Sequence, residues 1–226
     1  MFDPWAGLCS ATVAMVRYSC TTTARSRTTL REDSGAGSEC EHAPQQVWKV
    51  EMAEAIWTIG HSTRPLEGFL DLLAENRIEA LADVRRYPGS RRWPHFAQTA
   101  LAMALEKRGL VYMWFPELGG RRTPRPDSPN TAWRNHAFRG YADYMATEDF
   151  AEGLNRLVNL ALGLRTAVMC AEAVWWRCHR GLVADVLRWL GFEVFHIMGP
   201  SSTVSHPYTA AARIVRGRLS YSAGAA

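Results

Sequence analysis

The sequence between residues 165 and 198, "RTAVMCAEAVWWRCHRGLVADVLRWLGFEVFHIM", predicts a strand, a helix and a second strand in succession. The apolar run "RTAVMCAE" indicates a buried strand, and "FEVFHIM" indicates another. Between them, "CHRGLVADVLRWLG" has the periodicity of a helix that ends at Gly191. Strands that alternate with helices are typical of a parallel sheet, so this stretch favours an α/β fold.

The same alternation extends upstream. The predicted strands are "AIWTIGHS", "EALADVR" and "LVYMWFPE", and the predicted helices are "PLEGFLDLLAENRI", "QTALAMALEKRG" and one or two within "YADYMATEDFAEGLNRLVNLALGL". We therefore expect a single layered α/β domain over residues 52–212, with a mainly parallel sheet of about five strands flanked by helices. Residues 213–226, which are polar and rich in small side chains, are expected to form a flexible tail.

The first 51 residues differ from this pattern. They are rich in Thr, Ser, Arg and Gly and have no apolar period, so we expect a disordered extension or an over-extended start, with the native chain beginning at Met52. No apolar run in the chain is long enough to cross a bilayer. Only Cys170 and Cys178 lie beyond residue 51, too few for a disulfide framework, which favours a reducing, cytoplasmic location.

The predicted strands end in polar or small residues. Ligands of parallel α/β sheets bind at the carboxyl ends of the strands, so these residues are expected to meet at one rim. In chain order they are Gly60, His61, Ser62, Asp83, Arg85, Glu117, Gly119, Gly120, Cys170, Glu172 and His196. Solvated loops also supply polar residues after strands, but the abundance of His, Asp, Arg, Cys and Glu favours a site.

Positive charge is concentrated in the middle of the chain. Residues 85–139 contain eleven Lys or Arg and three acidic residues, whereas the whole chain has a net charge of +4. Two predicted loops, "RRYPGSRRWPHF" and "GGRRTPRPDSPNTAWRNHAFRG", alternate Arg with aromatic residues. Arginine binds phosphate oxygens and aromatic rings stack on bases, so the expected partner is a phosphate-bearing small molecule or a nucleic acid, with Arg91 and Arg122 among the binding residues. The alternative is a solvated basic loop.

Five motifs, "TIGHS", "DVRRYPGSRRWPHF", "YMWFPELGG", "FRGYADYM" and "MCAEAVWWRCHR", occur in this order. Together they make the chain, from about Ile56 to Ile197, resemble the domain-of-unknown-function-488 family. The resemblance implies a small, mainly bacterial, cytosolic α/β protein and supplies no reaction. The segment "AVWW" departs from the family's pattern, which is polar and contains Pro at this place.

The predicted first turn of the last helix contains Cys178, His179 and Arg180. A helix N-terminus favours an anion, so Arg180 is predicted to hold a phosphate there. The same position favours a thiolate, which makes Cys178 a candidate nucleophile. Either His179 or His61 is its candidate base, and Glu172 is a candidate orienting or acid/base group.

Other interpretations of these residues stay open. The cysteines, histidines and Glu172 offer three or four metal ligands, but no C-x-x-C or H-E-x-x-H motif is present, so no metal is predicted. Cys170 is expected to belong to the core, as is His196. Two residues apart on a strand, Asp83 and Arg85 share a face and form either an ion pair or a base with its partner.

Three small residues at the rim also have two interpretations each. Ser62 either caps a helix or contacts substrate. Gly119 and Gly120 either supply positive φ for a turn or permit close approach of a substrate.

The sequence thus leaves two functions. The first is an enzyme of hydrolase or transferase type that acts on a phosphate-bearing substrate at the rim. The second is a nucleic-acid-binding module without chemistry, which uses the basic aromatic loops.

Overall fold

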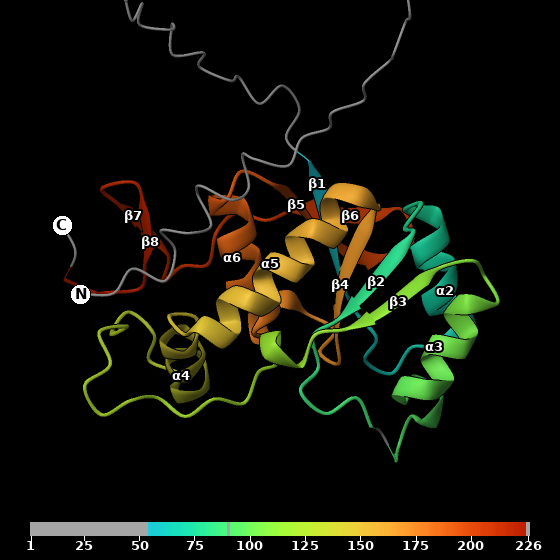
Figure 1. Ribbon diagram of the computed structural model, residues 1–226, viewed down its shortest axis with the longest axis horizontal. Coiled ribbons are helices and arrows are strands. Elements are labelled where there is room, and N and C mark those ends of the chain that lie inside the picture. The colour runs from blue at the N-terminus through green and yellow to red at the C-terminus, as the bar shows by residue number, and fades with distance from the viewer. Residues whose placement is uncertain (1–53, 90, 225–226) are drawn as a thin grey trace, which may run out of the picture.

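A computed structural model describes residues 54–89 and 91–224 (Figure 1). The expected N-terminal extension over residues 1–51 lies outside the described residues. In chain order the elements are β1 (Ala55–Gly60), α2 (Leu66–Glu75), β2 (Ala80–Asp83), η1 (Pro94–Phe96), α3 (Gln98–Glu106), β3 (Val111–Trp114), η2 (Pro116–Leu118), α4 (His136–Tyr144), α5 (Glu148–Gly163), β4 (Thr166–Cys170), η3 (Trp175–Arg177), α6 (Arg180–Trp189), β5 (Glu193–Gly199), β6 (Ser202–Ser205), β7 (Arg213–Val215) and β8 (Arg218–Ser220).

The main sheet has six strands in the order β3-β2-β4-β1-β5-β6. The first five are parallel, and β6 pairs antiparallel with β5 at the edge. The predicted layered α/β fold with a mainly parallel sheet is confirmed. The extra strand β6, "STVS", is exposed along its whole length and has no apolar alternation, which explains why the sequence pattern did not indicate it.

Helices cover both faces of this sheet. Leu81 and Met169 point to the face covered by α2 and α3, whereas Ala82, Val168 and Cys170 point to the face covered by α4, α5 and α6. This alternation follows from the period of two along a strand. Figure 1 shows α5 crossing the sheet on the second face. Strands buried on both faces read as near-continuous apolar runs, which is why β4 was recognisable from sequence.

The carboxyl end of β4 is where the chain changes sides. Strand β4 lies between β1 and β2. The helices that follow β1 and β2 pack on one face, whereas α6, which follows β4, packs on the other. Loops that leave neighbouring strands in opposite directions open the kind of crevice in which α/β proteins bind ligands. Cys170, the last residue of β4, lies at this switch point.

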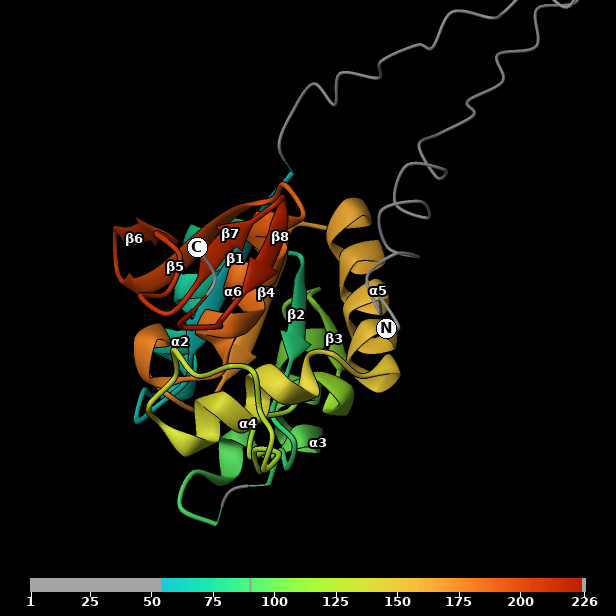
Figure 2. The same ribbon diagram turned by 90° about the vertical axis from the view of Figure 1, so that its left-hand side faces the viewer.

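The C-terminal segment differs from its expectation. Residues expected to form a flexible tail contain the β7–β8 hairpin, which lies beside α6 (Figures 1 and 2). Tyr221 is buried, and its hydroxyl donates to Asp185 Oδ2 of α6 at 2.9 Å. Strands of three residues are too short to show periodicity in a sequence. Among the described residues, no helix combines the length and apolar character that a membrane span requires.

Candidate functional site

Three side chains with metal-ligating and nucleophilic atoms meet at the carboxyl end of β4. Cys170 ends the strand, and Cys178 and His179 immediately precede α6. His179 Nδ1 lies 3.9 Å from Cys170 Sγ and 3.7 Å from Cys178 Sγ, and the three atoms all lie within 4.8 Å of one another. We call this group the thiol–imidazole centre. Both cysteines are free thiols and buried.

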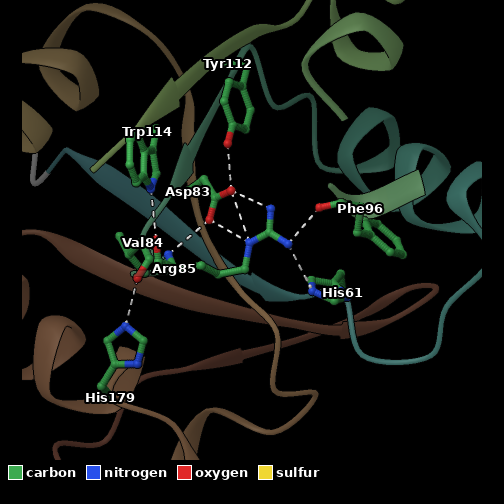
Figure 3. A network of polar contacts seen from close by, with 8 residues as sticks. All are labelled: His61, Asp83, Val84, Arg85, Phe96, Tyr112, Trp114 and His179. Atoms are coloured by element: carbon green, nitrogen blue, oxygen red, sulfur yellow. Dashed lines mark hydrogen bonds and ion pairs between the residues drawn. The ribbon is translucent and has the colours of Figure 1, made fainter. Parts of the chain in front are cut away.

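The orientation of His179 is set by the neighbouring strand. Its Nε2 lies 3.1 Å from the carbonyl oxygen of Val84, just beyond β2 (Figure 3). A carbonyl oxygen only accepts hydrogen bonds, so Nε2 carries the hydrogen. In the neutral ring, Nδ1 therefore presents its lone pair to the two sulfur atoms.

The two thiols occupy different electrostatic environments. Burial alone would raise the pKa of Cys178, but the hydrogen bond from Cys170, together with His179 and Arg180, lowers that pKa well below its ordinary value. The backbone N–H of Arg180 also lies 3.5 Å from Cys178 Sγ. The same Cys170–Cys178 contact, with burial, raises the pKa of Cys170. The centre therefore favours a thiolate at Cys178 and a thiol at Cys170.

Arg180 and Glu172 were both predicted to act at this rim. The Arg180 side chain is buried, and its Nη2 donates to the carbonyl oxygens of Glu172 (2.8 Å) and Ala173 (3.2 Å). The structure thus uses Arg180 to hold the loop after β4. The carboxylate of Glu172 is exposed, and the hydrogen bonds described for this residue involve its backbone. Their roles toward a substrate stay predictions.

The end of β2 carries a closed polar network (Figure 3). Arg85 donates from Nε and Nη2 to the Asp83 carboxylate, at distances down to 2.6 Å, and from Nη1 to the carbonyl oxygen of Phe96. Tyr112 donates to Asp83 Oδ2 at 2.7 Å. The predicted same-face pair is confirmed, with Val84 in the core on the opposite face. Asp83 is fully buried and each of its oxygens is bonded, so the ion-pair interpretation fits it better than a general base.

His61 and Ser62 lie between the polar network at the end of β2 and the loop that follows β4. His61 Nε2 lies 3.4 Å from Arg85 Nη1, and its Nδ1 lies 3.0 Å from the Ser62 carbonyl oxygen. Burial and Arg85 lower the pKa of His61 to about 4, so the ring is neutral at pH 7. The Ser62 N–H donates to the Ala171 carbonyl oxygen at 2.9 Å, which joins the loops after β1 and β4. Ser62 does not cap α2, whose N-cap residue is Pro65.

The two rim glycines allow neighbouring residues of the chain to pack closely against their backbone. The interpretation that Gly119 and Gly120 supply positive φ is wrong, because neither adopts positive φ, and the left-handed residue is Arg121 at φ 62°. A Cβ on Gly119 would lie 2.7 Å from Arg86 Cβ, and a Cβ on Gly120 would lie 2.7 Å from His179 Nδ1. A side chain at either position would therefore displace a neighbour.

Arginines of the two basic loops meet beside these glycines. Arg86 Nη1 donates to the Arg121 carbonyl oxygen at 3.1 Å, and Arg122 Nε donates to the Gly119 carbonyl oxygen at 3.1 Å. The Arg122 guanidinium also stacks 3.5 Å from the centre of the Tyr144 ring. In the described part of the chain, none of these arginines forms an ion pair with a carboxylate. We call Arg86, Arg121 and Arg122 the basic rim.

Arg91, the remaining predicted binding residue, lies in the loop between β2 and η1 and is exposed. Its side chain is not joined to the basic rim by any described hydrogen bond or ion pair.

Cys170, expected at the rim and in the core, is buried in the core and also contacts His179, whereas Arg86 and Arg121 were not singled out from the basic loops. Cys170 is the final residue of an apolar run, so its contact with the Cys-His pair eight residues later needed the strand-to-helix turn to be known. The expectation that His196 is a core histidine is confirmed. It is buried, its Nδ1 lies 2.7 Å from Thr58 Oγ1, and its Nε2 lies 2.9 Å from His206 Nδ1.

A family model described as "Domain of unknown function DUF488" matches residues 65–187, which include both the thiol–imidazole centre and the basic rim. No curated protein and no solved structure matches the chain.

Proposed function

The chain belongs to the DUF488 family of unknown function, and we propose that it is a cytoplasmic enzyme of hydrolase or transferase type that acts on a phosphate-bearing substrate. One observation carries the proposal. Gly119 lies against Arg86 and Gly120 lies against His179, so the basic rim and the thiol–imidazole centre adjoin. Arginines suited to phosphate and a group with thiol and imidazole chemistry thus lie side by side, which supports the proposal.

The basic rim supports a phosphate-bearing substrate. Arg121 is exposed, and Arg86 and Arg122 are partly exposed. Guanidinium groups match the geometry of phosphate oxygens, and those without a carboxylate partner are available to an anionic ligand. Phosphate bound there lies next to His179, across Gly120.

The thiol–imidazole centre supports chemistry. Cys178 supplies sulfur in its thiolate form, which is the form that acts as a nucleophile or a metal ligand. His179 Nδ1, 3.7 Å from that sulfur, is placed to exchange a proton or to share a ligand with it. Perturbed titratable groups that cluster at a strand end are typical of active sites.

A nucleic-acid-binding module without chemistry is the second candidate. Tyr87 favours it, since its ring is 65% exposed and the Arg86 guanidinium lies 5.5 Å from its centre. An exposed aromatic ring beside arginine suits stacking on an unpaired base.

Turnover assays separate the two candidates. The full chain is incubated with phosphomonoesters, nucleotides and short oligonucleotides, and product release is compared among wild type, Cys178→Ser, Arg121→Ala and Arg108→Ala. Arg108 is the matched control, because it pairs with Glu67 beyond the end of α3, away from both groups. The enzyme proposal predicts turnover that is lost in Cys178→Ser and reduced in Arg121→Ala. Oligonucleotide binding without turnover, unchanged in Cys178→Ser, would favour the second candidate.

A further inference from the structure

We propose that the thiol–imidazole centre is a Zn²⁺ site, with Cys170 Sγ, Cys178 Sγ and His179 Nδ1 as ligands and a fourth position open to water or a substrate oxygen. This inference deepens the proposed function, because it names what the centre holds. Two thiolates and an imidazole form a ligand set that Zn²⁺ favours, and three protein ligands with one open position are typical of catalytic zinc.

The spacing of the ligand atoms fits one ion. Zinc binds sulfur at about 2.3 Å and nitrogen at about 2.0 Å, so a tetrahedral site places sulfur and nitrogen about 3.5 Å apart. The observed separations from His179 Nδ1 are 3.9 Å to Cys170 Sγ and 3.7 Å to Cys178 Sγ. A contraction of a few tenths of an ångström brings each sulfur to its tetrahedral distance from Nδ1, and the two sulfurs lie within 4.8 Å of one another.

The second ring nitrogen of His179 is already held. Metal-ligating histidines nearly always donate their other N–H to a carbonyl or a carboxylate, which fixes the tautomer and the ring orientation. His179 Nε2 lies 3.1 Å from the Val84 carbonyl oxygen, an interaction that leaves Nδ1 for the ion. The side chain is therefore preorganised on the rigid sheet.

Space and burial favour an ion over a bulky reactant at the sulfurs. Cys170 is 7% exposed and Cys178 is 4% exposed, so little of either side chain is open to a bulky reactant. Gly120, however, leaves the space beside His179 Nδ1 free of a side chain.

A zinc ion at this place gives the basic rim a partner in catalysis. Zinc polarises a phosphoryl oxygen or lowers the pKa of a bound water to form a hydroxide nucleophile. Arg121 and Arg122, which follow Gly120 in the chain, then hold the phosphate against the open position.

The test measures zinc content and affinity in the full chain. Cys9, Cys20 and Cys40 are changed to Ser in one background, so that any remaining sulfur ligand is Cys170 or Cys178. Metal-free protein is titrated with Zn²⁺ against a chromophoric chelator, and with Co²⁺ to detect thiolate charge-transfer absorption. The variants are Cys178→Ser, Cys170→Ser and His179→Ala, with His136→Ala, an exposed histidine at the start of α4, as control.

We expect one Zn²⁺ per chain, a thiolate–cobalt band, and a loss of affinity of more than about 100-fold in each ligand variant but not in His136→Ala. Circular dichroism identifies variants that fail to fold. In place of such a variant's zinc affinity, the reaction of the wild-type thiols with a disulfide reagent is measured with and without Zn²⁺, and a bound ion should slow that reaction. Absence of zinc uptake by the wild type, or uptake unchanged in folded Cys178→Ser and His179→Ala, would overturn the inference.

The two proposals fail separately. Zinc binding without turnover of any phosphate substrate leaves the metal site standing and removes the proposed function. Turnover that persists in chelator-treated, metal-free protein, yet is lost in Cys178→Ser, supports the proposed function and overturns the zinc site.

Discussion

The neighbouring strands β2 and β4 end in two polar groups of opposite character. After β2, the Asp83–Arg85 pair is closed, because the carboxylate receives Arg85 and Tyr112 while the guanidinium also reaches a backbone carbonyl. After β4, the contacts of the sulfur atoms of Cys170 and Cys178 are longer: 3.9 and 3.7 Å to His179 Nδ1, and 3.5 Å from Cys178 Sγ to the Arg180 N–H.

This difference distinguishes a group that stabilises the fold from a group that we propose binds a ligand. A buried charge persists only when its partners satisfy it, so the closed group at β2 is a structural device that fixes the strand end. The group at β4 brings two sulfurs and a ring nitrogen within 4.8 Å of one another without short hydrogen bonds between them. It is therefore the group at which we propose that a ligand binds.

The largest loss of stability is expected when the Asp83 carboxylate is removed from the polar network at β2. Asp83→Ala leaves the Arg85 guanidinium buried without its carboxylate, which we expect to lower the unfolding free energy by about 3 to 5 kcal/mol. Urea denaturation followed by circular dichroism measures this. The double variant Asp83→Ala/Arg85→Met is the control and should recover part of the loss. A single-variant loss below about 1 kcal/mol would show that the pair is not structural.

In contrast to Asp83→Ala, Cys178→Ser is expected to reduce turnover strongly and stability only slightly. We expect turnover to fall by more than about 100-fold, because the thiolate is lost, and the unfolding free energy to fall by only about 1 to 2 kcal/mol. Rates and denaturation curves on one preparation make the comparison. A variant that keeps turnover but unfolds as readily as Asp83→Ala would invert the roles of the two strand ends.

Gly120→Ala tests the space between the basic rim and the thiol–imidazole centre. The added Cβ lies 2.7 Å from His179 Nδ1, so the ring must shift, at a cost of about 1 to 3 kcal/mol and with reduced turnover. Gly68→Ala is the matched control. Gly68 lies within α2 with no atom within 4 Å of its added Cβ, and this change should stabilise the protein by about 0.5 to 1 kcal/mol. Equal changes in stability and turnover for Gly120→Ala and Gly68→Ala would show that the contact between Gly120 and His179 does not require glycine.

The smallest expected effect comes from a second closed group, in which His206 links His196 to the Asp185 carboxylate. Burial, His206 and Arg180 lower the pKa of His196 to about 2 from its ordinary 6.5, so the folded protein keeps this ring neutral. The unfolded chain takes up the proton below pH 6.5, and stability present above that pH is lost as pH falls.

Between pH 7 and pH 5.5 this histidine contributes a loss of about 1.3 kcal/mol in unfolding free energy. Denaturation at both pH values, in wild type and in His196→Gln, measures its share. Identical pH dependence in the two proteins would show that His196 is not held neutral by the fold.

The sequence revealed the fold more readily than the site. Strands β1, β2, β4 and β5 are apolar runs, and the pairing of Asp83 with Arg85 followed from the period of a strand. The position of β4 between β1 and β2 leaves no trace in periodicity. That position brings the Val84 carbonyl oxygen to His179 and makes the end of β4 the switch point of the sheet. The glycine contacts at the rim depend on the same long-range packing.

We propose that the basic rim and the thiol–imidazole centre form one site. Nuclear magnetic resonance of the ¹⁵N-labelled histidine rings, recorded during a titration with inorganic phosphate, tests it directly. We expect the His179 ring signals to shift with phosphate, those of exposed His136 on α4 to stay fixed, and the double variant Arg86→Ala/Arg121→Ala to abolish the shift. His179 signals that stay fixed, or that move no more than those of His136, would contradict it.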